Sequence, residues 1–134
     1  MAARPLTLVS EQEYLASQYE PDCEFEDGVL IERNGGTEKH SWLQAALAAY
    51  FFRRRKRWDL TVYTEQRSRL RKGKYKLPDV CVIRGPRPSG PVLEKPPFLA
   101  IEILSPDDKP IRVDDSIDAW LTFEVPLKQL DEDE

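Results

Sequence analysis

Three acidic side chains lie in or beside apolar β-type runs of this 134-residue chain. Asp79 precedes the run Val80-Cys81-Val82-Ile83, and Glu102 lies within Ala100-Ile101-Glu102-Ile103-Leu104. A buried carboxylate costs free energy unless it is paired or ligates a cation. Mg²⁺ prefers oxygen ligands and often needs only one or two carboxylates. We therefore predict that Asp79 and Glu102 share a site for a hard divalent ion; the alternative is ion pairing with arginines such as Arg84 or Arg112.

The third acidic group is Glu24, in the run Cys23-Glu24-Phe25-Glu26-Asp27-Gly28. The sequence leaves its role open. Alternation with Cys23 and Phe25 would place Glu24 on a solvent face of a strand, whereas a place near the other two carboxylates would make it a third acidic group.

Basic residues are concentrated between positions 53 and 76, where eleven Lys and Arg accompany only Asp59 and Glu65. This segment carries a net charge of +9 and the rest of the chain −13, although the whole chain is at −4. A concentrated basic patch can follow nucleic-acid phosphates locally. The alternative is a solvated helix end followed by a charged hairpin.

The elements that would position these residues can be predicted from local patterns. Ser10 and Glu13 form a capping box that opens a short helix, and Asp27-Gly28 has the residue types of a tight hairpin turn within residues 23–31. Thr37 caps a long helix over residues 37–58, with Leu43, Ala46, Leu47, Tyr50 and Phe51 on its core face. Strands follow within residues 60–83 and 98–104, and a helix over 113–123.

This order of elements predicts an α/β sandwich around a mixed β-sheet flanked by helices. The length indicates a single domain over residues 1–134, with a solvated acidic tail at 124–134. No apolar run approaches 18 residues, which predicts no membrane span. Two scattered cysteines, Cys23 and Cys81, are expected as buried free thiols of a cytoplasmic protein, and they offer no zinc-binding spacing.

The acidic motifs together resemble a known family. Cys23-Glu24-x-x-Asp27-Gly28, Pro78-Asp79-Val80 and Glu102-Ile103-Leu104-Ser105-Pro106 are similar to the pattern of a large bacterial family of putative restriction endonucleases, abundant in cyanobacteria, within the PD-(D/E)XK nuclease superfamily. The resemblance covers roughly residues 6–123.

The resemblance implies a restriction-endonuclease-like core that hydrolyses DNA phosphodiesters with Mg²⁺ or Mn²⁺ bound by Asp79 and Glu102. Glu24 would be a third ligand or acidic group, and His40, at the start of the long helix, would contact phosphate or assist proton transfer. The groups expected along the DNA backbone are basic side chains of one segment: Arg67, Arg69, Lys72 and Lys74.

Two departures from the family pattern bear on activity. The superfamily places a lysine two residues after the glutamate, where this chain has Leu104, and this family places it on the following helix, where the chain has Ser116. Lys76 and Lys109 are the candidate substitutes. The expectation is therefore an impaired endonuclease, and the alternative is an inactive homologue that binds nucleic acid or a protein.

The second departure is at the C-terminal end. The family continues with further strands where this sequence runs into its acidic tail, so the sheet is expected to lack its last strands. An exposed sheet edge can be covered by a second copy, which predicts a homodimer.

Overall fold

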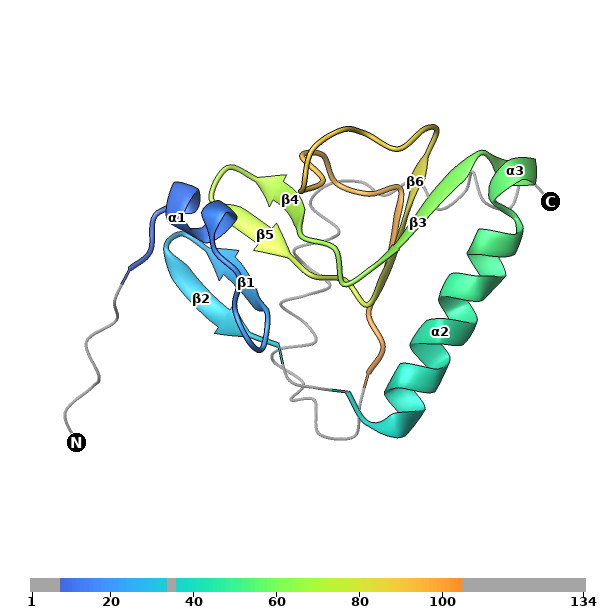
Figure 1. The fold of residues 1–134 in the computed structure, drawn as a ribbon, viewed down its shortest axis with the longest axis horizontal. Coiled ribbons are helices and arrows are strands. Elements are labelled where there is room, and N and C mark those ends of the chain that lie inside the picture. The colour runs from blue at the N-terminus through green and yellow to red at the C-terminus, as the bar shows by residue number, and fades with distance from the viewer. Residues whose placement is uncertain (1–7, 34–35, 105–134) are drawn as a thin grey trace.

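The computed structural model describes residues 8–33 and 36–104 (Figure 1). The predicted helix at 113–123, Lys109, Ser116 and the acidic tail lie outside the described residues. The elements in chain order are α1 (Glu11–Ala16), β1 (Cys23–Glu26), β2 (Val29–Glu32), α2 (Glu38–Arg53), α3 (Arg55–Trp58), β3 (Leu60–Thr64), β4 (Ser68–Arg71), β5 (Lys74–Lys76), β6 (Val80–Arg84) and β7 (Leu99–Ile101).

The first sheet has the strand order β2-β1-β5-β4, with antiparallel neighbours. The predicted capping box is confirmed at its N-cap, because the Ser10 hydroxyl accepts the Glu13 N–H at 3.0 Å. The predicted hairpin turn is confirmed too: Asp27 and Gly28 have φ of 48° and 93°, the positive values that such a turn requires. Helix α1 packs on this sheet through a buried cluster of Tyr14, Cys23, Phe25 and Tyr75.

The second sheet has the order β3-β6-β7, again antiparallel. Thr37 caps α2 as predicted, but the helix ends at Arg53 and a short α3 follows. The core of this half consists of Phe51, Trp58, Leu60 and Val82. Figure 1 shows α2 on the opposite side of the molecule from the β1–β2 hairpin.

The α/β class with flanking helices is confirmed, and the described strands form two antiparallel sheets where one mixed sheet was expected. The core face predicted for the long helix is largely wrong. Of its five residues only Phe51 is buried, while Leu43 and Tyr50 are 39% and 42% exposed. Both cysteines are buried free thiols, as expected. None of the described helices is long and apolar enough to cross a membrane.

One of the connections between the two sheets is formed by the three residues between β5 and β6: Leu77, Pro78 and Asp79. All three are buried. This link places Asp79 where the two sheets meet.

Candidate active site

Asp79 is a buried carboxylate with contacts from several parts of the chain. It is 1% exposed, and its Oδ2 accepts the Ile103 N–H at 2.6 Å. Its Oδ1 lies 2.8 Å from Arg33 Nη2 and 3.2 Å from His40 Nε2. These contacts join the start of β6, the segment after β7, the residue after β2 and the first turn of α2 around one carboxylate.

Glu24 is buried, not solvent-facing, so the solvent-face alternative is wrong. β1 is the second strand of its sheet, between β2 and β5, and Glu24 is 3% exposed. Its Oε2 accepts the Leu77 N–H at 2.8 Å, and its Oε1 lies 3.6 Å from Lys76 Nζ. The backbone just before Asp79 therefore holds Glu24 in place.

Glu102 follows β7 and is half-buried. The pairing of Val80 with Ile101 in the β6–β7 register brings the Glu102 backbone next to that of Asp79. Its Oε2 lies 3.5 Å from Arg33 Nη1. The predicted convergence of Asp79 and Glu102 is thus present, and both contact the same cation.

That cation is Arg33, which was not named from the sequence, whereas Arg112 lies outside the described residues. Arg33 Nη1 also lies 3.8 Å from Glu24 Oε2, so a single guanidinium contacts all three acidic groups. Burial alone would lower the pKa of Arg33, but the charges of Glu102, Glu24 and Asp79 outweigh it and raise the pKa. Arg33 is therefore a charged guanidinium at the centre of an acidic cluster.

The register of the β1–β2 hairpin explains why Arg33 lies next to Glu24. Glu24 pairs with Ile31 across β1–β2, and side chains two residues apart on a strand share a face. The Arg33 N–H continues the ladder to the Asp22 carbonyl at 3.0 Å. Arg33 consequently lies on the face of Glu24.

α2 completes the cluster with two polar side chains. His40, in its first turn, contacts Asp79 as given above, and its N–H is held by the Thr37 hydroxyl at 3.3 Å. One turn later, Gln44 Nε2 donates to the Asp79 carbonyl at 2.8 Å. His40 is thus within reach of the acidic groups, whereas nothing in the sequence pattern indicated Gln44.

The donor chemistry of this cluster suits a hard divalent ion, because carboxylate oxygens are the ligands that Mg²⁺ and Mn²⁺ prefer. Within the part of the chain that the structure describes, no three His, Cys, Asp or Glu side chains lie close enough together to hold a metal ion as they stand. The oxygens of Asp79 and Glu102 face the Arg33 guanidinium instead.

The four predicted DNA contacts lie on or near the β4–β5 hairpin but have different surroundings. Arg67 is held inside the molecule: it donates to the Tyr14 carbonyl at 2.9 Å, pairs with Asp22 at 3.1 Å and lies over the Tyr14 ring. Arg69 pairs in register with Tyr75, on the side of the Tyr14 cluster, and its Nε is buried.

Lys72 and Lys74 are better placed to reach a ligand. Lys72 is exposed at the β4–β5 turn. Lys74 Nζ lies 3.3 Å from Glu26 Oε1, and its register partner Glu26 shares a face with Glu24. Contact of any of the four with DNA stays a prediction.

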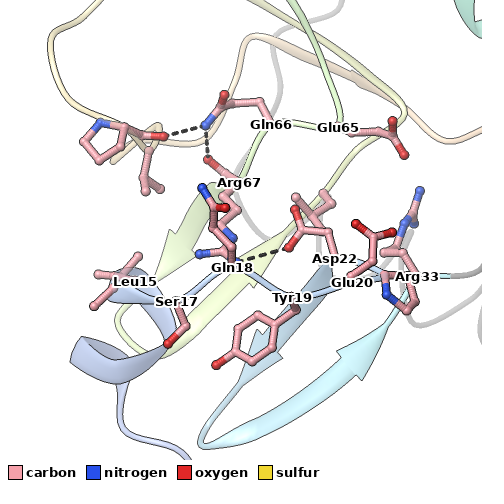
Figure 2. A pocket seen from close by; sticks show the side chains of 15 residues that line it. Leu15, Ser17, Gln18, Tyr19, Glu20, Asp22, Arg33, Glu65, Gln66 and Arg67 are labelled. Atoms are coloured by element: carbon pink, nitrogen blue, oxygen red, sulfur yellow. Dashed lines mark hydrogen bonds and ion pairs between the residues drawn. The ribbon is translucent and has the colours of Figure 1, made fainter.

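A pocket of about 700 Å³ adjoins the acidic cluster (Figure 2). Arg33 and Leu77 line this pocket, and both also contact Glu24 of the cluster. The pocket is also lined by the acidic residues Glu20, Asp22 and Glu65, and by Tyr19 and Arg67. Arg33 therefore separates a carboxylate cluster from a water-accessible space.

Comparison with known proteins gives a fold relative and a family. A crystal structure of a putative nuclease belonging to DUF820, from Anabaena variabilis, is similar with a TM-score of 0.73 and 24% sequence identity, over 86% of this chain and 69% of that one. At this identity the likeness establishes the shared fold. No curated protein matches the chain.

The family model described as "Uma2: Putative restriction endonuclease" matches residues 11–127. The match spans most of the chain and includes Glu24, Asp79 and Glu102. The chain therefore belongs to the Uma2 family of putative restriction endonucleases.

Proposed function

We propose that this protein is a metal-dependent endonuclease that hydrolyses DNA phosphodiester bonds. The observation that carries the proposal is the convergence of Glu24, Asp79 and Glu102 on one cationic group. Burying several carboxylates together is costly, and a structural ion pair would need only one of them. Membership of a nuclease family supports the same reading.

Asp79 and Glu102 would hold Mg²⁺ or Mn²⁺, with Glu24 as a third oxygen donor directly or through water. When bound, such an ion activates a water molecule and neutralises charge that develops on the phosphate. The chain itself fixes the ligands. The Ile103 N–H orients Asp79, and the Leu77 N–H orients Glu24.

We propose Lys76 as the lysine of this site, because the chain has Ser116 where the resemblance places a lysine. Lys76 lies beside Glu24 with its side chain 11% exposed, so its charge acts in a partly desolvated setting where it is strong. His40, in contact with Asp79, would exchange a proton with the leaving oxygen or the attacking water. Lys109, the other candidate, lies outside the described residues.

DNA is the proposed substrate and partner. The side chains proposed to contact its backbone are Arg67, Arg69, Lys72 and Lys74, and Lys72 is the most accessible of the four. We also place the protein in the cytoplasm, because both described cysteines are free thiols, as is usual in a reducing compartment.

We further propose a homodimer. Helix α2 exposes the large apolar side chains Trp42, Leu43 and Tyr50, at 68%, 39% and 42%. Exposed apolar patches commonly mark contact surfaces between proteins, and a second copy is the simplest occupant. Sedimentation velocity at micromolar concentration should show a dimer that Trp42→Lys dissociates. A monomer in the wild-type chain would contradict this.

The central experiment is cleavage of supercoiled plasmid by the full chain with Mg²⁺ or Mn²⁺. We expect metal-dependent nicking that is lost in Asp79→Asn and retained in Asp27→Asn, whose carboxylate pairs with Arg71 at an exposed site. Equal cleavage by wild type and Asp79→Asn would refute the assignment. Binding of DNA without any cleavage would instead favour the inactive homologue.

The lysine is tested separately with Lys76→Met. Loss of one preorganised positive group should lower the cleavage rate by about 10²–10³. Lys56→Met removes the same charge from an exposed position on α3, outside the acidic cluster, and should change the rate far less. If Lys76→Met cleaves as well as wild type, while Ser116→Lys raises the rate, the functional lysine belongs at position 116.

A further inference from the structure

We propose that Arg33 is a resident counter-cation that a divalent metal must displace, so that metal binding moves its guanidinium out of the acidic cluster. This inference rests on the proposed function, because it concerns the same three carboxylates. It adds a residue that sets the metal affinity of the site and has no place in the family motif described above.

The first argument is geometric. Arg33 Nη2 lies 2.8 Å from Asp79 Oδ1, and Nη1 lies 3.5 Å from Glu102 Oε2 and 3.8 Å from Glu24 Oε2. The guanidinium thus contacts an oxygen of each prospective ligand. A metal held by these oxygens would compete with the guanidinium for them.

The second argument concerns charge. Without a metal, three carboxylates converge at a site where Asp79 and Glu24 are buried, and a buried unpaired carboxylate is strongly unfavourable. Arg33 offsets this repulsion and keeps the cluster folded in the metal-free protein. A divalent ion offsets it better, and its own repulsion of the guanidinium then favours departure of Arg33.

The third argument is that the adjoining pocket offers the Arg33 side chain an alternative position. Its backbone is fixed by the hydrogen bond from its N–H to the Asp22 carbonyl, whereas its side chain lines the adjoining pocket of about 700 Å³ (Figure 2). Glu20, Asp22 and Glu65 line the same pocket. A rotation of the side chain would move the guanidinium from the carboxylates of the cluster to those that line the pocket.

Metal affinity in the absence of DNA tests the proposal without depending on catalysis. Mn²⁺ binding would be measured by electron paramagnetic resonance for wild type, Arg33→Gln and Arg33→Lys. We expect Arg33→Gln to bind Mn²⁺ at least about tenfold more tightly than wild type, which is the effect of removing about 1.4 kcal/mol of competition. Arg33→Lys keeps the charge and should stay close to wild type.

Arg71→Gln is the matched control, because it removes a guanidinium from an exposed ion pair with Asp27 and should leave Mn²⁺ affinity unchanged. Equal or weaker binding by Arg33→Gln would overturn the displacement. If Arg33→Gln is unfolded alone but folds when Mn²⁺ is added, the metal has replaced the guanidinium, and the proposal is supported.

A measurement on the wild-type chain covers the case in which Arg33→Gln does not fold at all. In arginine side-chain NMR, the Arg33 Nε–H resonance, assigned by its absence in Arg33→Lys, should shift as Mg²⁺ is added. An unchanged resonance at saturating Mg²⁺ would overturn displacement while leaving the nuclease proposal intact. Absence of any Mn²⁺ or Mg²⁺ binding in wild type and Arg33→Gln alike would remove the proposed function and this inference together.

Discussion

At the scale of single residues, the site is organised by the need to compensate buried charge. Asp79 satisfies its oxygens with the Ile103 N–H, Arg33 and His40, and Glu24 uses the Leu77 N–H and Lys76. These contacts come from several separate stretches of the chain. The acidic residues therefore hold the fold together as well as offering ligands, and the two roles can be separated by measuring stability and cleavage in the same variants.

Asp79→Asn should destabilise the metal-free protein by up to about 3–5 kcal/mol, because the half-buried Arg33 loses its nearest anionic partner. Urea denaturation followed by circular dichroism would measure the loss. Asp27→Asn, which breaks an exposed ion pair with Arg71, should cost far less. A similar loss in the two variants would show that burial does not control the energetics of the cluster.

The Cys81 thiol should make the free energy of unfolding depend on pH in the alkaline range. Burial raises the pKa of this thiol from 9.0 to about 12. Above pH 9 the unfolded chain loses this proton first, so stability should be fully present below pH 9 and fall as the pH rises toward 12, by a few kcal/mol. Unfolding free energies of wild type and Cys81→Ala, determined between pH 8 and 11, would measure this fall. The plot of unfolding free energy against pH should be flatter for Cys81→Ala. Parallel curves would contradict the assignment.

At the scale of elements, the β1–β2 hairpin and the β5–β6 link do most of the positioning. The hairpin register places Glu24 and Arg33 on one face, and the buried link Leu77-Pro78-Asp79 connects the two sheets. Helix α2 then reaches across to Asp79 with His40 and Gln44. The site is thus formed at the junction of three elements that are each short or exposed on their own.

Gln44→Leu tests how α2 is attached. The variant leaves the carbonyl of the buried Asp79 without its 2.8 Å donor, and an unsatisfied buried acceptor costs about 1–3 kcal/mol. We expect a corresponding drop in unfolding free energy. Ser41→Ala, at an exposed position on the same helix, should be close to neutral; if the two variants are equally stable, this hydrogen bond does not anchor α2.

At the scale of the whole molecule, charge is distributed unevenly. The chain is at −4 overall, but residues 53–76 carry +9. This segment includes α3, at one end of the molecule, and the β4–β5 hairpin, nearer the other (Figure 1). Binding of DNA to such a protein should be local, weak at physiological salt and strongly dependent on ionic strength.

Lys72→Glu tests which basic region follows DNA. Because Lys72 is exposed at the β4–β5 turn, the variant should weaken binding to all DNA sequences alike and reduce the slope of log K against log salt by about 1 or more. Fluorescence anisotropy with a labelled duplex would measure both. Lys56→Glu makes the same charge change on α3, and an equal effect there would show that attraction is general rather than local.

The sequence alone determined the features that depend on neighbouring residues. The caps at Ser10 and Thr37 and the Asp27-Gly28 turn follow from local backbone hydrogen bonding and conformational preference. The two apolar strands that carry Asp79 and Glu102 were also recognisable, because a carboxylate beside a run of buried side chains needs a partner. The convergence of these two carboxylates was predicted on that ground alone.

Tertiary structure decided which group is the partner. The hairpin register places Arg33 on the face of Glu24, but Arg33 lies 46 residues from Asp79 and 69 from Glu102 in sequence, and no local pattern marks those two contacts. The helix face was misjudged for a related reason: periodicity identifies apolar positions such as Leu43 and Tyr50, but only packing against the second sheet selects Phe51 for burial. Local rules set the elements, whereas charge compensation and burial are settled by groups that meet only when the chain has folded.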